Sequence, residues 1–135
     1  MSIRNILDSE DSAFIQKYET VMIRMGGAWA ITSALNMSFN FYRDGNNVTI
    51  TRGTLGNTPT VQNGVIKSLD RIPDLYIPKE NVFIPIILRG NSTSMVSTMS
   101  IEDGYINIYN GPPPNTWGTG FNVGFFYPIS INYSV

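Results

Sequence analysis

The sequence predicts an all-β fold, an antiparallel two-sheet sandwich of the jelly-roll type, from two observations. Apolar and polar residues alternate along most of the chain, and from Thr20 onward turn-forming residues recur about every eight to twelve positions. This spacing predicts about eight to ten strands. Two packed sheets would bury the apolar faces of such strands against each other, so a sandwich is the economical arrangement.

The clearest element is a β-hairpin over residues 94–109. Its two alternating runs meet at Asp103-Gly104, and glycine there accepts the positive φ that a tight hairpin turn requires. A second hairpin over residues 37–52 turns at residues 44–47, with Met37 and Phe39 on its apolar face.

The remaining elements are weaker. A strand from Thr20 is predicted to end at Gly26-Gly27, and residues 28–34 follow as a short strand. Residues 58–69 form a strand with a bulge at Gly64. The last strands are expected at residues 121–126 and 128–135.

Three prolines restrict the middle of the chain. Pro73 and Pro78 exclude a helix and predict an extended loop. Pro85 removes a backbone donor, so the strand over residues 82–88 is expected at a sheet edge or a bulge.

The chain of 135 residues reads as one jelly-roll domain, residues 20–135, after an N-terminal arm, residues 1–19. Apolar residues of the arm fall near helical spacings. The arm is either a flexible or packed extension or an attachment segment, and the sequence leaves both readings open.

Charged residues make up 14% of the chain and the net charge is −1, so the sequence carries no basic footprint for nucleic acid. Asn, Ser and Thr together supply 37 residues. The surface is therefore expected to be neutral and rich in hydrogen-bonding groups, which suits burial against a partner.

The chain contains neither cysteine nor histidine. Disulfides, thiolate metal sites and the usual general bases are thereby excluded, and no cofactor or metal and no enzymatic activity is expected. Asp8, Glu10 and Asp11 stand where a signal peptide would be apolar, and no stretch is long enough to insert into a membrane.

The carboxylates are the remaining groups for chemistry. Glu102 and Asp103 are adjacent on the hairpin turn, where their side chains diverge, so a structural role is expected. Asp44 with the nearby asparagines could offer oxygen ligands to calcium, although a hairpin turn explains the same residues. In the end loops, Trp117 either contacts a ligand such as a glycan or covers the end of the sandwich, and Asn91 is the other candidate ligand-binding residue.

The order of four segments resembles a known group of proteins. The segments are NMSFNFYRDGNNVTIT, IPDLYIPKENVFIPI, SIEDGYINIYNG and FFYPISINYSV. Over roughly residues 26–135 the chain resembles the jelly-roll heads of phage tail fibres and virion spikes, and is similar to the tumour necrosis factor (TNF) and complement globular-head superfamily.

The resemblance implies a compact, TNF-like homotrimer in which the last strand lies near the threefold axis. Tyr105, Tyr109, Ile131 and Tyr133 are then the candidate trimer-interface residues. It further implies a non-enzymatic structural protein in the virion or the host cytoplasm, whose other partners are virion proteins or a host surface protein or glycan. The alternative is a lectin-like or cytokine-like binding module that uses its end loops.

Overall fold

The computed structural model describes residues 14–29, 35–52, 57–90, 93–118, 121–124 and 128–135. These residues form nine strands and one short 3₁₀ turn, which confirms the all-β class and the expected number of strands. The elements are β1 (Gln16–Trp29), β2 (Leu35–Asp44), β3 (Asn47–Arg52), β4 (Asn57–Arg71), η1 (Asp74–Tyr76), β5 (Val82–Gly90), β6 (Thr93–Glu102), β7 (Tyr105–Tyr109), β8 (Phe121–Gly124) and β9 (Ile129–Ser134).

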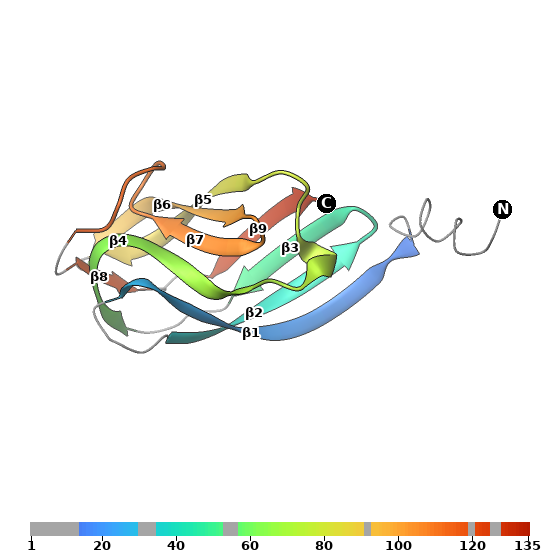
Figure 1. Cartoon of the computed structure of the whole chain (residues 1–135), viewed down its shortest axis with the longest axis horizontal. Helices are drawn as coiled ribbons and strands as arrows, with labels where there is room; N and C mark the ends of the chain where they lie inside the picture. Colours follow the sequence, from blue (N-terminus) through green and yellow to red (C-terminus); the bar gives the residue numbers. More distant parts are fainter. Residues whose placement is uncertain (1–13, 30–34, 53–56, 91–92, 119–120, 125–127) are drawn as a thin grey trace.

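The strands form one curled antiparallel sheet around a single apolar core. Its order is β7-β6-β5-β8-β4-β1-β2-β3-β9, β7 also pairs with β4, and β9 contacts β5. The meanders β1-β2-β3 and β5-β6-β7 both contribute side chains to this core, and β4 runs between β1 and β7 (Figure 1).

This ladder differs from the predicted pair of separate sheets, so the two-sheet jelly roll is not confirmed. The cause is β4, whose 15 residues reach both meanders. Lys67 of β4 is paired with Gly26 of β1 on one edge and with Asn107 of β7 on the other. The first half of β4 pairs with β8 instead.

Both predicted hairpins are confirmed. Asp103 and Gly104 have φ angles of 52° and 84°, the positive values that a tight turn between β6 and β7 requires. The alternating apolar residues of these hairpins are buried; they include Met37, Phe39, Phe41, Val48, Ile50, Met99, Ile101, Ile106 and Ile108.

The prediction that a strand ends at Gly26-Gly27 is wrong, because β1 continues to Trp29. A side-chain carbon added to Gly26 would lie 3.3 Å from Leu69 Cδ2, so this glycine makes room for a neighbouring side chain. Residues 28 and 29 of the predicted next strand therefore belong to β1, and residues 30–34 lie outside the described residues.

The N-terminal boundary also differs in detail. β1 begins at Gln16, so residues 16–19 of the predicted arm are part of the sheet. Residues 1–13 lie outside the described residues.

The prolines and Gly64 behave largely as expected. Pro85 is paired with Thr98 of β6, whereas β5 pairs with β8 only at Arg89 and Gly90, so Pro85 occupies an edge within the described sheet. Gly64, at φ 129°, lies where the register between β1 and β4 shifts. Between Pro73 and Pro78, however, the chain forms η1 rather than an extended loop.

Burial of Tyr76 explains η1. Its ring is fully buried and stacks on Phe41, with ring centroids 4.8 Å apart. Tyr133 Oη donates a hydrogen bond of 2.5 Å to the Tyr76 carbonyl. The turn thus places Tyr76 in the core beside Phe41 and Tyr133.

Gly104→Ala is expected to destabilise the fold more than other glycine substitutions. The new methyl carbon would lie 2.9 Å from both Arg71 Nε and Ile77 Cδ1, at a φ of +84°. Together, strain and crowding should cost about 1–3 kcal/mol, measured by urea unfolding.

Two other glycines provide matched controls. Gly111→Ala has a similar φ of +83° but no close neighbour, and Gly118→Ala has nothing within 4 Å. Gly104→Ala should lower the free energy of unfolding most, Gly111→Ala less, and Gly118→Ala least. Equal stability of the Gly104 and Gly118 variants would contradict this account.

Candidate functional site

The predicted end-loop residues do not form an exposed site in the described part of the chain. Trp117 is fully buried, and its indole N–H donates a hydrogen bond of 2.9 Å to the Ile108 carbonyl. Its backbone N–H donates to the Gly64 carbonyl at 2.7 Å. Trp117 therefore packs in the core and exposes no ring face to a ligand, and Asn91 lies outside the described residues.

The four candidate trimer residues divide into two pairs. Ile131 and Tyr133 of β9 are buried, with 2% and 7% of their surface exposed, inside the subunit's own core. Tyr105 and Tyr109 are half-buried on the outer face of β7. Their role at a trimer interface stays a prediction.

The carboxylates at the hairpin turn serve local structure. Glu102 Oε2 accepts hydrogen bonds from Ser100 Oγ at 2.6 Å and from Tyr109 Oη at 2.5 Å. Asp103 forms the turn, and its backbone N–H donates to Asn81 Oδ1 at 3.1 Å. Among the described residues, no three acidic, histidine or cysteine side chains come together as a metal site. The same residues contain no helix long and apolar enough to cross a membrane.

The first candidate surface is an apolar stripe on the outer face of β5 and β6, formed by Phe83, Pro85, Ile87 and Val96. Ile87 and Val96 lie directly opposite each other across the two strands. Phe83, Ile87 and Val96 expose 49%, 52% and 65% of their surface. The stripe is uncharged, and exposed apolar side chains gathered on one sheet face indicate a contact surface.

The outer face continues from the stripe onto β7. Pro85 pairs with Thr98, and Thr98 pairs with Tyr109. The Lys67 ammonium lies 5.3 Å from the centre of the Tyr105 ring, a favourable cation–π distance. The stripe and the two outward tyrosines therefore share one face.

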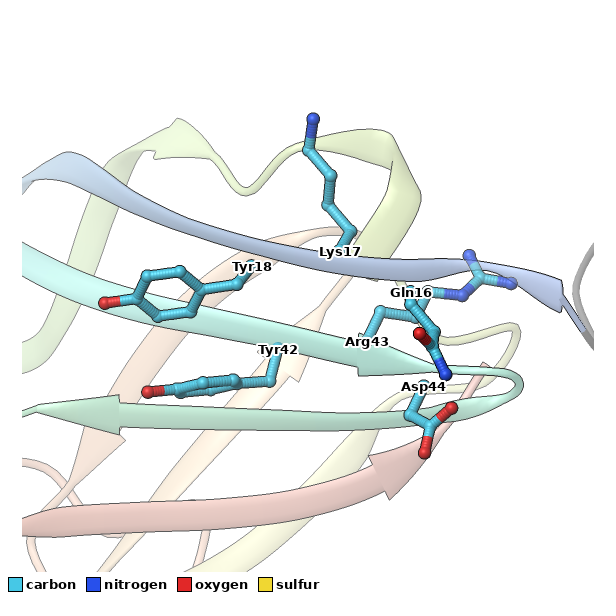
Figure 2. Close-up of a pocket in the computed structure, with 6 residues that line it drawn as sticks. All are labelled: Gln16, Lys17, Tyr18, Tyr42, Arg43 and Asp44. Carbon is cyan, nitrogen blue, oxygen red and sulfur yellow. The ribbon is translucent and has the colours of Figure 1, made fainter.

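The second candidate surface is a tyrosine platform on the outer face of β1 and β2, formed by Gln16, Tyr18, Tyr42 and Asp44. Tyr18 is paired with Tyr42 and Gln16 with Asp44. The two rings lie 4.6 Å apart, tilted by 40°, and expose 57% and 44% of their residues' surface. Figure 2 shows both rings projecting the same way along the strands, away from Gln16 and Asp44, which lie at the strand ends.

The platform borders a shallow depression of about 350 Å³. Lys17 and Arg43 complete its lining, although Lys17 projects away from the two rings (Figure 2). Two hydrogen bonds fix the Arg43 side chain. Its Nε donates to the Gly45 carbonyl at 2.8 Å, and its Nη1 donates to the Leu75 carbonyl at 2.6 Å. Desolvation, followed by the neighbouring Tyr18, raises the pKa of Tyr42 above its ordinary value.

Neutral polar side chains continue the same face onto β3 and β9. Asn132 Nδ2 donates to Thr49 Oγ1 at 2.8 Å, and Thr20 Oγ1 donates to Asn40 Oδ1 at 2.7 Å. The sequence predicts a surface rich in neutral hydrogen-bonding groups, and this face carries such groups. The platform itself was outside the sequence prediction, because Tyr18 fell in the predicted arm and its pairing with Tyr42 depends on long-range register.

The stability of the protein is expected to fall between about pH 10 and pH 12 through Tyr109. Burial, followed by the hydrogen bond to Glu102, raises the pKa of Tyr109 to about 12. The pKa of an unfolded tyrosine is about 10, so this stabilisation is complete below about pH 10 and is lost as the pH rises through 12.

Urea unfolding of Tyr109→Phe across this window tests the effect. The variant should lose stability less steeply than the wild type, with Tyr105→Phe as the control on the same strand that keeps the Tyr109–Glu102 hydrogen bond. Burial raises the pKa of Tyr133 as well, so some decline remains in every variant. Identical slopes for Tyr109→Phe and the wild type would contradict the assignment.

No protein-family model matches the sequence, and no curated protein sequence matches it. Among solved structures, the chain is similar to the reovirus attachment protein sigma1, solved in complex with alpha-2,3-sialyllactose, at 14% identity and a TM-score of 0.40. The similarity covers 87% of this chain and 66% of the sigma1 chain, so this chain spans just under two thirds of that protein.

Proposed function

We propose that the chain is a non-enzymatic interaction protein, a TNF-like homotrimeric head that acts on a virion or binds a host component. The observation that carries the proposal is the apolar stripe. Three of its side chains expose about half of their surface or more. Burying such side chains against a second copy would stabilise the assembly by the hydrophobic effect.

The surroundings of the stripe suit contact between copies of one chain. The residues of β6 that pair with Pro85 and Phe83 are neutral, namely Thr98 and Ser100. Identical subunits meeting there would bring no like charges together at the centre of the contact. Tyr105 and Tyr109 lie on the same outer face, and aromatic residues are enriched at interfaces.

Support for a non-enzymatic role comes from the functional groups available. The chain has no histidine or cysteine. Glu102 is occupied by two hydrogen bonds, and Asp70 forms an ion pair with Arg24 at 2.7 Å. These carboxylates stabilise the sheet rather than face a shared cavity.

A monomeric, lectin-like binding module is the second candidate. The tyrosine platform favours it, since exposed aromatic pairs with polar neighbours are typical of ligand sites. In that case the contact would lie on the sheet face rather than in the end loops.

Light scattering coupled to size exclusion is expected to give a mass near three times the 15.0 kDa subunit. The Ile87→Lys, Val96→Lys double variant should elute as a monomer, because the trimer contact would then bury two unpaired charges per subunit. Both sites are exposed, so the subunit should stay folded.

Thr20→Lys is the matched control, because it adds a charge to the outer face of β1, away from the stripe. It should leave the mass unchanged. A wild-type monomer at micromolar concentration, or a double variant that remains a trimer, would overturn the proposed assembly.

A further inference from the structure

We propose that the tyrosine platform is a binding site for a neutral glycan, in which one pyranose ring packs against the exposed side of the Tyr18–Tyr42 pair. The site lies on a different meander from the apolar stripe, so substitutions in the stripe leave its residues unchanged. Its argument rests on the aromatic pair, the polar groups beside it and the sign of the local charge.

The two rings offer a surface suited to a sugar ring. Both are exposed by about half and lie 4.6 Å apart. The face of an aromatic ring carries negative charge density, which attracts the weakly positive C–H groups that line one side of a pyranose. The two rings already pack against each other across paired strands, so a sugar would bind the exposed side of the pair at little cost in side-chain ordering.

Hydrogen-bonding groups lie one row from the tyrosines on the same face. Gln16 and Asp44 occupy the next row of the same face, and successive rows are separated by roughly 7 Å. Among the described residues, neither side chain forms an intramolecular hydrogen bond, so both can bind hydroxyl groups. A carboxylate accepts two such bonds, and charge-assisted bonds are the stronger kind.

The charge on this face favours a neutral sugar over an acidic one. The carboxylate of Asp44 lies one row from Tyr42 on the same face and would repel a ligand carboxylate that reaches this row. Lys17 projects away from them, and Arg43 is held by two backbone carbonyls on the other side of the strand. The Asp44 carboxylate would therefore disfavour binding of an acidic sugar.

A proline-rich peptide is the competing occupant, because such peptides also dock on aromatic side chains. The platform suits a proline-rich peptide less well, because the residues in the rows next to the tyrosines carry amide, carboxylate and hydroxyl groups rather than apolar ones. These rows include Gln16, Asp44, Asn47, Thr49, Asn132 and Ser134. Hydroxyl-rich ligands satisfy such groups better than an apolar ring does.

The first experiment applies the full chain to an array of neutral and sialylated oligosaccharides. Binding to neutral structures is expected, with sialylated forms bound no better than their neutral parents. Saturation-transfer NMR with the best neutral oligosaccharide then measures binding by each variant.

Tyr18→Ala and Tyr42→Ala should each weaken binding at least tenfold, and Asp44→Asn should weaken it severalfold. Tyr42→Phe keeps the ring and should stay within about threefold of the wild type, which separates stacking from the loss of a hydroxyl. The exposure of these residues makes the variants compatible with folding, and circular dichroism checks this.

The Ile87→Lys, Val96→Lys double variant separates this site from the trimer. The double variant should bind the oligosaccharide in solution with the same affinity per site. On the array it should bind more weakly, because a monomer lacks the avidity of three linked sites. The inference is overturned if no neutral oligosaccharide binds, if only sialylated ones bind, if Tyr18→Ala and Tyr42→Ala bind like the wild type, or if a proline-rich peptide binds the platform instead.

Discussion

The pairing of β4 on both of its edges is the constraint on which the rest of the structure depends. Through Lys67, the strand bonds to β1 on one side and to β7 on the other. The two meanders thereby become one ladder that curls around a common core. Gly26 and Gly64 permit this pairing, the first by admitting Leu69 and the second where the register shifts.

Curling also gives the protein two outer faces of different chemistry. Because side chains alternate along each strand, burial of one set fixes the other set on the surface. On β5 and β6 that outer set includes the apolar stripe, whereas on β1, β2, β3 and β9 it is mostly polar around the two tyrosines. Both proposed roles follow from this division, one for association and one for ligand binding.

The sequence predicts well what depends on neighbouring residues. The alternation around Phe39 and Ile106 and the turn at Asp103-Gly104 gave two hairpins correctly, because strand faces and tight turns are local properties. The features that the sequence did not predict depend on long-range strand pairing. The continuity of the ladder through β4, the passage of β1 through Gly26 and the contact of Tyr18 with Tyr42 all depend on partners distant in the chain.

Pro85 has a consequence for how the protein can assemble. An exposed strand edge invites further strands to add, which leads to open-ended fibrils. Proline has no amide hydrogen to offer an incoming strand, so it interrupts such growth along the edge of β5. In the proposed assembly, copies of this chain would therefore meet through their faces, and face contacts between identical subunits can close into a ring of fixed size.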